Sequence, residues 1–356
     1  MAKILTINPG STSTKIAVYE NLTLAFMTNI SHSADELLPF NSVVEQFLFR
    51  KAMILKTLSE NGIANDNFDT IVGRGGLLHP IESGVYEINE DMLDDLRSCR
   101  YGEHASNLGA MLANEIAHQI QHCRAFIADP VVVDELQEVA RISGLRQIPR
   151  RSIFHALNQK AIARKYAAQK GVPYEELNLI IAHLGGGISV AAHSCGRVID
   201  VNQALGGFGP FSPERAGTLD SEQLVQMCFS GDYTKQQISK MLVGQGGMVA
   251  HLGTNDGREI ERRVREGNEQ AMLITQAMAY NIAKEIGSLI PVLKGKADCV
   301  ILTGGIAHNP FIVKYIKEMI EPVLSVVMFP GEDEMEALAM AAMRILEGEQ
   351  AKTYYK

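Results

Sequence analysis

The chain has 356 residues, of which 46% are hydrophobic, and a formal net charge of −8 at pH 7. This length exceeds that of one typical domain, so we expect two domains with separate cores. The acidic balance excludes a general nucleic-acid or membrane-surface binder, because such proteins concentrate positive charge. Any anion site must therefore be local.

The cysteines and the N-terminus indicate the cellular compartment. The five cysteines are scattered and form no C-x-x-C pair, so neither a disulfide framework nor a zinc site is expected. An apolar strand follows Met1, Ala2 and Lys3 directly, and no run of about 20 apolar residues occurs. We expect a cytoplasmic protein with no membrane partner.

The first motif is a hairpin over residues 5–19. Two apolar runs flank a glycine turn that carries Asn8, Ser11, Ser13 and Lys15. Hydroxyls, backbone N–H groups and an ammonium at such a tip suit a phosphate group. The alternative is an ordinary serine-rich turn.

A second copy of this pattern occupies residues 177–201. It has an apolar strand, the turn Gly185, Gly186 and Gly187, a returning strand and a third strand, as residues 5–30 do. Two matching three-stranded meanders predict a duplicated domain. If the halves face one another, the two tips can grip one phosphate chain.

Two charged residues follow predicted strands in the first half. Arg74 stands among Gly73, Gly75 and Gly76 after a strand at 68–72, where the glycines would let a phosphate or carboxylate approach the guanidinium. Asp129 ends a strand at 125–128, where α/β sheets hold ligands, although helix capping would also explain an aspartate there.

The second half adds further candidates. His183 precedes the triple-glycine turn and can donate to a phosphate oxygen, as His155 can from the start of a helix. Arg215 lies on a glycine- and proline-rich loop, where it serves either phosphoryl transfer or a salt bridge to Glu214 or a neighbouring residue. A strand at 300–302 runs into Gly304 and Gly305, which allow a ring or phosphate to approach the backbone.

Apolar periodicity predicts the helices. They cover residues 35–61 in one or two segments, 87–99, 104–117, 156–168, 220–229, about 258–290, 311–320 and 334–346. His104, His118 and His122 are interpreted as surface or helix-end residues. The sequence contains no Walker A motif, no G-x-G-x-x-G dinucleotide motif and no protein-kinase motif, so nucleotide binding must use the glycine turns.

Taken together, the segments INPGSTSTKIAVYE, AHLGGGISVAAH, FSPERAGTLD and ILTGGIAHN resemble the acetokinase family over nearly the whole chain. The resemblance implies an α/β fold of two duplicated actin-like ATPase (ribonuclease H-like) domains around a central cleft. It also implies phosphoryl transfer between ATP and a short-chain carboxylate, with Mg²⁺. The implied domains are 1–151, with helix 334–356 packing back on it, and 152–333, which binds the nucleotide.

The resemblance also implies roles for individual residues. Catalysis is expected from Arg74, Arg215, His155 and Asp129, and the metal is expected at Asn8 and Glu336. The ATP-binding residues are expected to be Asn8, Ser11, Ser13, Lys15, His183, Gly185, Gly186, Gly187, Asp256, Arg258, Gly304, Gly305, Ile306 and Asn309. The family further implies a homo-oligomer, a dimer or larger.

Two departures from the family pattern bear on the substrate. Gly76 replaces a bulky aliphatic residue and Gly206 replaces a proline, which would enlarge the acyl cavity and favour butyrate or a branched four- or five-carbon acid. Gly257 stands where a large residue would stack on the base. The alternatives are an acetate or propionate kinase and a non-catalytic nucleotide sensor on the same scaffold.

Overall fold

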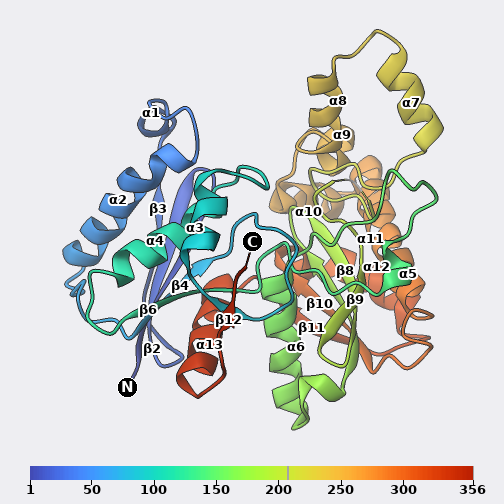
Figure 1. Ribbon diagram of the computed structural model, residues 1–356. Helices are drawn as coiled ribbons and strands as arrows, with labels where there is room; N and C mark the ends of the chain where they lie inside the picture. Colours follow the sequence, from blue (N-terminus) through green and yellow to red (C-terminus); the bar gives the residue numbers. More distant parts are fainter. Residues whose placement is uncertain (207, 356) are drawn as a thin grey trace. The chain divides into compact units, whose positions relative to one another are not determined.

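The computed structural model describes residues 1–206 and 208–355 (Figure 1). The chain divides into two compact units. Unit 1 comprises Met1–Val133, Ala156–Ala161 and Asp333–Lys356, and unit 2 comprises Asp134–His155 and Ile162–Glu332. The expected division into two bodies, each with its own core, therefore matches the structure.

Unit 1 is built on a seven-stranded sheet in the order β12-β5-β6-β4-β1-β2-β3. Its strands are β1 (Lys3–Pro9), β2 (Ser13–Glu20), β3 (Thr23–Ser31), β4 (Thr70–Arg74), β5 (Val85–Glu87), β6 (Arg124–Ala128) and β12 (Lys352–Thr353). Its helical segments are α1 (Ala34–Leu37), η1 (Val44–Gln46), α2 (Phe47–Glu60), α3 (Glu90–Arg97), α4 (Asn107–Ala117) and α13 (Glu334–Leu346). The central strands β1, β4 and β6 are parallel.

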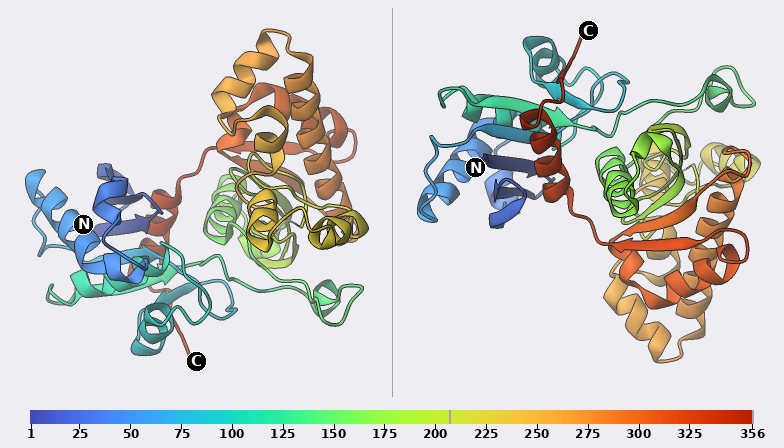
Figure 2. Two further views of the ribbon diagram at one scale, coloured as in Figure 1. Left: turned by 90° about the horizontal axis from the view of Figure 1, so that it is seen from above. Right: turned by 90° about the horizontal axis from the view of Figure 1, so that it is seen from below.

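The central strands of the unit 1 sheet are buried on both faces, because alternate side chains pack into different layers. Leu5 and Ile7 of β1 pack with α2, α3 and α4 in one core. Ile4 of the same strand packs with α13 in a second core. Figure 2 shows α13, in dark red, lying against the blue and teal strands. The predicted return of the C-terminal helix to the first half is thus seen as packing on β1 and β4.

Unit 2 contains a five-stranded sheet in the order β11-β10-β7-β8-β9. Its strands are β7 (Asn178–Leu184), β8 (Ile188–Ser194), β9 (Arg197–Val201), β10 (Cys299–Gly304) and β11 (Val326–Pro330). Its helical segments are α5 (Glu138–Arg141), η2 (Tyr174–Glu176), α7 (Ser221–Phe229), α8 (Lys235–Leu242), α9 (Gly247–Leu252), α10 (Gly257–Arg265), α11 (Glu269–Leu289), η3 (Gly305–His308) and α12 (Pro310–Ile320), and α6 (Ala156–Lys170) begins in unit 1 and ends in unit 2.

The two predicted meanders are confirmed. β1, β2 and β3 pair antiparallel in succession, and β7, β8 and β9 do the same. In unit 2, Ile180 and Val300 pack with α11 and α12, while Leu179 and Ile301 pack with α6 on the other face. The duplicated α/β architecture follows from this repeated arrangement.

Two sequence-based boundaries need correction. Residues 134–151, expected in the first domain, group with unit 2 because Gln137 N donates to Ile199 O at 3.0 Å and Arg150 pairs with Asp200 at 2.6 Å. The helix expected over 258–290 is two helices, α10 and α11. Gly267 adopts φ +82° between them, and Asn268 caps α11, so the chain cannot continue as one helix.

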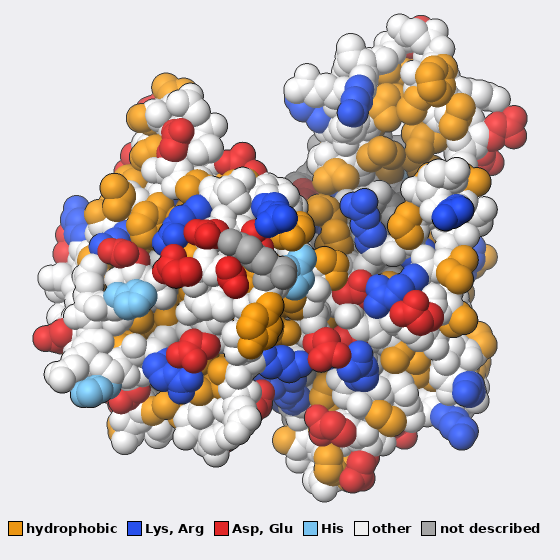
Figure 3. Space-filling view, in the orientation of Figure 1, with side chains coloured by type: hydrophobic (Ala, Val, Ile, Leu, Met, Phe, Trp, Pro, Cys, Tyr) orange, Lys and Arg blue, Asp and Glu red, His pale blue; other side chains and the backbone are white. Residues whose placement is uncertain are grey.

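The face seen in Figure 3 has no large basic region among the described residues, as expected for a chain with a net charge of −8. Figure 3 shows basic and acidic side chains interspersed over the visible face, without a continuous basic surface. No helix within the described residues is long and apolar enough to span a membrane.

Candidate active site

In unit 1, the turn between β1 and β2 exposes polar groups on a rigid base. Ser11 and Lys15 are exposed, whereas Thr14 between them is fully buried. Gly10 N donates to Ser13 O at 2.7 Å and closes the turn. Lys15 makes no ion pair within the described residues, so its ammonium is available to an anion.

The carboxyl ends of the parallel strands bring Asn8 and Arg74 together. Ile7 of β1 is opposite Gly73 of β4, which places the next residue on each strand side by side. Arg74 Nη1 donates to Asn8 Oδ1 at 3.3 Å. Ligands of α/β sheets bind at this edge, so the register supports the predicted site.

Glu334, which the sequence reasoning missed, joins this pair. Its Oε2 accepts from Asn8 Nδ2 at 2.5 Å and from Arg74 Nη1 at 3.0 Å. Glu334 is the first residue of α13, and Glu336, the predicted metal residue, lies two positions later. The only local signal was an acidic residue at a helix N-terminus, which the helix dipole explains equally well.

His104 is a second residue near this cluster. Burial lowers its pKa most, and the positive charge of Arg74 lowers it further. Its Nδ1 is 2.8 Å from Ser106 Oγ at the start of α4. The interpretation of His104 as a helix-end residue is correct in position, but it overlooked the neighbouring guanidinium.

Asp129 directly follows β6, at the carboxyl end of the strand, as expected. The next helix, α5, begins only at Glu138, so helix capping is wrong. The buried carboxylate of Asp129 accepts from Ser83 Oγ at 2.7 Å and Gly84 N at 2.8 Å. Its φ of +37° is unusual for a residue other than glycine. The carboxylate thus fixes a turn beside the carboxyl end of β6.

The glycines around Arg74 serve packing and not ligand access. A Cβ at Gly73 would overlap Gly109 O of α4, and one at Gly75 would lie 2.5 Å from Pro130 Cβ. A Cβ at Gly76 would lie 2.6 Å from Asn107 Cα. The space is already filled, so the expectation that Gly76 enlarges an acyl cavity is wrong.

Gly206 has a different setting. A Cβ there would overlap Oε1 of Gln203, which is the end of a flexible side chain. Gly206 and Gln203 also line a cavity of about 560 Å³ together with Arg150, Arg151 and Phe208. The expectation that Gly206 enlarges the acyl cavity therefore stays a prediction.

In unit 2, the two predicted histidines are in direct contact. The rings of His155 and His183 stack with centroids 3.8 Å apart and planes inclined by 11°. His155 Nδ1 is 2.9 Å from Ser189 Oγ, and His183 Nε2 is 3.1 Å from Glu332 Oε1. These contacts orient both rings.

The triple-glycine turn and Arg215 are also adjacent. A Cβ at Gly187 would overlap Arg215 Nη1, so this glycine makes room for the guanidinium. Arg215 Nη1 donates to Ala204 O, while its Nε is buried without a partner in the described part of the chain. Burial lowers the pKa of Arg215, and Glu214 opposes this effect. The expected salt bridge between Arg215 and Glu214 is not formed.

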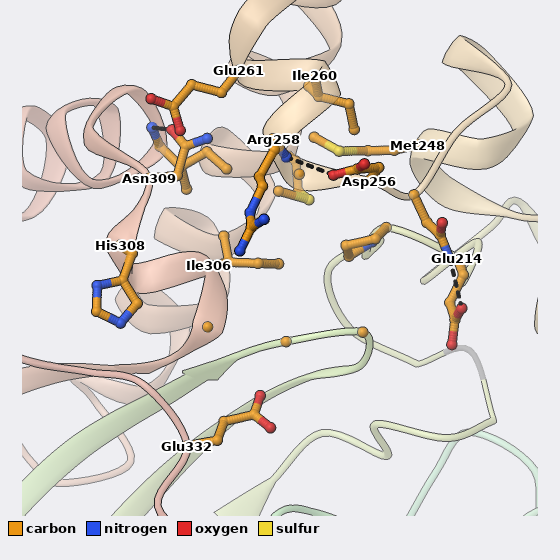
Figure 4. Close-up of a pocket in the computed structure, with 18 residues that line it drawn as sticks. Glu214, Met248, Asp256, Arg258, Ile260, Glu261, Ile306, His308, Asn309 and Glu332 are labelled. Carbon is orange, nitrogen blue, oxygen red and sulfur yellow. Dashed lines mark hydrogen bonds between the residues drawn. The ribbon is translucent and has the colours of Figure 1, made fainter. Parts of the chain in front are cut away.

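A cavity of about 680 Å³ lies in unit 2 next to this turn. Its lining includes Gly185, Gly186, Glu214, Met248, Asp256, Gly257, Arg258, Ile260, Met278, Gly305, Ile306, Asn309, Ile312 and Glu332. Figure 4 shows the Arg258 side chain extending into the cavity near Ile306. This volume and mixed apolar and polar lining are typical of a small-molecule site.

Helix caps hold two polar residues of the cavity in place. Asp256 accepts from Arg258 N at 2.9 Å and caps α10, and Asn309 accepts from Phe311 N at 3.0 Å and caps α12. Gly304, with φ +88°, has a different role. A Cβ there would overlap Leu184 O, so Gly304 allows β10 to approach β7. Gly257 has nothing within 4 Å of its would-be Cβ, which leaves that wall open.

The donor groups fit a nucleoside triphosphate and Mg²⁺. The cavity offers apolar side chains for a base and glycine backbone for phosphates. In unit 1, Asn8 Oδ1 and the Glu334 carboxylate are oxygens of the kind that Mg²⁺ prefers, and Asn8 Oδ1 and Glu334 Oε2 both accept from Arg74 Nη1. Few protein oxygens are needed, because Mg²⁺ retains waters and binds substrate phosphates.

Known proteins resemble this chain in sequence over almost its whole length. The model of the acetokinase family matches residues 139–346. Butyrate kinase 2 of Clostridium acetobutylicum is 51% identical over 354 residues, and a probable butyrate kinase of Phocaeicola vulgatus is 54% identical over 354 residues, with 99% of both chains covered in each case. The chain belongs to the acetokinase family. It is therefore a phosphotransferase with a carboxylate as acceptor.

Solved acetokinase-family structures share the fold. An acetate kinase of Porphyromonas gingivalis has a TM-score of 0.77 at 19% identity, covering 97% of this chain and 100% of its own. A propionate kinase of Francisella tularensis has a TM-score of 0.73 at 19% identity, covering 96% and 99%. The likeness confirms the expected actin-like ATPase fold.

Proposed function

We propose that this acetokinase-family member phosphorylates butyrate or a branched four- or five-carbon acid with ATP, and catalyses the reverse reaction. The proposal rests on the position of the Arg74 guanidinium. Asn8 and Glu334 hold it by hydrogen bonds at the carboxyl ends of β1 and β4. A partly exposed guanidinium at that edge suits a carboxylate. The butyrate kinases reported above, alike over 99% of the chain, favour the longer acid over acetate.

The chemistry needs no general base. A carboxylic acid with pKa of about 4–5 is ionised at neutral pH, so its oxygen is already a nucleophile. That oxygen attacks the γ-phosphorus, the bond from phosphorus to the β–γ bridging oxygen breaks, and ADP leaves. No proton is transferred, and the main barrier is bringing two anions together.

Positive charge and N–H groups lower that barrier. Arg74 is assigned to the carboxylate, and Arg215, with its unpartnered Nε, to the transferring phosphoryl group. Preorganised donors of this kind usually contribute most of the rate in phosphoryl transfer. His155 and His183 are assigned to phosphate oxygens, and Asp129 to orientation of the strand edge near the acid.

The cavity of unit 2 is assigned to the nucleotide. Ile306, Met248 and Met278 would contact the base, Asp256 and Arg258 the ribose and phosphates, and Gly185, Gly186 and Gly187 the phosphate chain. Mg²⁺, when bound, would offset the negative charge of the phosphates. Asn8 and Glu334 are the residues assigned to it, with Glu336 a further candidate on the same helix.

A hydroxamate assay tests the proposal. The protein is incubated with ATP, Mg²⁺ and each unbranched or branched acid from two to five carbons, and the acyl phosphate is trapped with hydroxylamine. We expect the highest kcat/KM for a four- or five-carbon acid. Equal or better turnover of acetate would assign the protein to acetate, and ATP binding without any acyl phosphate would identify a sensor.

A further inference from the structure

Arg50 of α2 is a completely buried arginine beneath the β1–β2 turn. Its Nη1 donates to Gly10 O at 2.7 Å and Ser13 O at 2.9 Å, and its Nη2 donates to Ser11 O at 2.9 Å. Thr12 O accepts instead from His32 N at 2.8 Å. All four carbonyls of residues 10–13 are therefore bound within the protein.

The N–H groups of this turn have a different environment. Those of Ser11 and Thr12 donate to no acceptor in the described structure, and both residues are exposed. A peptide unit whose carbonyl is turned inward must turn its N–H the other way. The inward pull on consecutive carbonyls thus creates the outward N–H groups that a phosphate oxygen needs.

The hydrogen bonds of Arg50 extend to the neighbouring side chains. Nη1 also donates to Thr14 Oγ1 at 3.1 Å, and the same hydroxyl is hydrogen-bonded to His32 Nε2 at 2.9 Å. Burial lowers the pKa of His32 most and Arg50 lowers it further, while Glu36 opposes both effects. The contacts fix the turn from its buried side.

Arg50 has no carboxylate partner in the described residues. Its remaining donors go to Gln46 Oε1, at 3.0 Å from Nε and 2.8 Å from Nη2. A buried cation is costly unless its hydrogen bonds are made, and here neutral carbonyls of the turn accept three of them and neutral side chains accept the others. Core packing alone does not require a guanidinium at this place.

We propose that Arg50 is the positioning residue of the β1–β2 turn, holding the Gly10, Ser11 and Ser13 carbonyls inward so that the turn presents its N–H groups to the transferred phosphate. The inference rests on the proposed function of this turn. Arg50 does not touch the substrate. A lysine cannot replace it, because one ammonium lacks the planar fork that reaches three separate carbonyls.

The test compares Arg50→Gln and Arg50→Lys with the wild type and with Lys51→Gln. Lys51 is the next residue of α2 and pairs with Glu115 at 2.7 Å, so the control removes a partly buried cation from the same helix. Each protein is checked for its melting temperature, acyl phosphate formation, affinity for a fluorescent ADP and hydrogen exchange of the Gly10 and His32 amides.

We expect Arg50→Gln to lower kcat/KM at least 100-fold and Arg50→Lys at least 10-fold, with ADP affinity unchanged within twofold because its cavity is in unit 2. The Gly10 and His32 amides should exchange at least tenfold faster in both variants. Lys51→Gln should stay within threefold of the wild type in every measurement. Folded Arg50 variants with wild-type exchange and activity would overturn the proposal.

Gln46→Glu distinguishes an effect of Arg50 on the position of the turn from an effect of its positive charge. The glutamate keeps the acceptor for Arg50 but neutralises its charge, so a positioning role predicts at least a third of wild-type activity and normal exchange. Low activity with normal exchange would show that charge is what matters, and would overturn the proposal. A wild type inactive with every acid would instead reject the proposed function, while the exchange data would still decide how Arg50 acts on the turn.

Discussion

Arg74 and Glu334 are 260 positions apart in the chain, yet Arg74 Nη1 lies 3.0 Å from Glu334 Oε2. The arginine ends β4 and the glutamate begins α13. Both side chains are about one-fifth exposed, at 25% and 18%. A partly exposed ion pair at a strand edge can hold the guanidinium in place and still release one face to a substrate.

Arg74→Ala is expected to lower kcat/KM at least 100-fold, or about 2.7 kcal/mol in transition-state stabilisation, because the positive charge opposite the carboxylate is lost. Glu334→Gln should also reduce turnover, since the guanidinium loses its charged anchor. The hydroxamate assay measures both. Arg124→Ala, which breaks an exposed pair with Glu87, is the control and should retain activity. An Arg74→Ala protein with more than a tenth of the activity would remove Arg74 from the mechanism.

Arg74→Gln should raise the pKa of His104. Burial is the larger cause of the low pKa of this histidine and should persist, whereas the contribution of the Arg74 charge should disappear. The imidazole proton signals, followed by NMR against pH in the two proteins, give the pKa directly. An unchanged pKa would mean that the guanidinium is too well screened to act on His104.

Gly76→Ala tests what this glycine does. The added Cβ would lie 2.6 Å from Asn107 Cα, so we expect a loss of about 1–3 kcal/mol in unfolding free energy through overpacking. The ratio of kcat/KM for butyrate to that for acetate should hardly change. Thermal unfolding and the hydroxamate assay measure the two quantities. A stable variant in which the kcat/KM ratio changes in favour of acetate would instead show that Gly76 shapes the acyl cavity.

Ile306→Ala should weaken ADP binding about tenfold, or about 1.4 kcal/mol, because the side chain lines the cavity that we assign to the nucleotide. The KM for the carboxylate should stay unchanged. Titration with a fluorescent ADP provides the affinity. Val323→Ala, at a 67% exposed position in the same unit, serves as the control. Equal affinity of both variants would place the base elsewhere.

Tyr19→Phe should reduce the loss of stability at alkaline pH. Burial, together with the negative charges of Asp333 and Glu336, raises the Tyr19 pKa to about 12. The unfolded tyrosine titrates at about 10, so the protonated phenol stabilises the fold below pH 10 and this contribution falls as pH rises from 10 to 12. Urea unfolding at about pH 8 and pH 11 measures it. The same alkaline decrease in both proteins would contradict the shift.

Local features of the structure were predictable from the sequence. The two hairpins and α13 were predictable because apolar alternation, helical spacing and glycine turns are properties of neighbouring residues. The helix at Glu334–Leu346 has the bounds that its apolar spacing predicts, whereas the helix implied over 334–356 is too long, because the chain leaves α13 after Leu346 and forms β12 at Lys352–Thr353. Asp220 and Asn309 cap helices near the predicted starts. The break at Gly267 was missed because the apolar spacing continues across it.

Contacts between distant residues were less predictable. The roles of Glu334 and Arg50 depend on which strands are neighbours and on the register of β1 with β4. The glycines beside Arg74 suggested free space, but Gly109 and Asn107 fill it from α4. A glycine in the sequence shows that no side chain is present there, but it does not show which neighbouring atoms occupy the space.

The sequence by itself determined the duplicated hairpins, the type of most elements and the resemblance to a carboxylate kinase, because these rest on short-range patterns and on chemistry-bearing motifs. Only the tertiary structure decided that Glu334 anchors Arg74, that Arg50 supports the first turn and that residues 134–155 belong with unit 2. Those relationships arise from packing between segments far apart in the chain, and no local propensity encodes them.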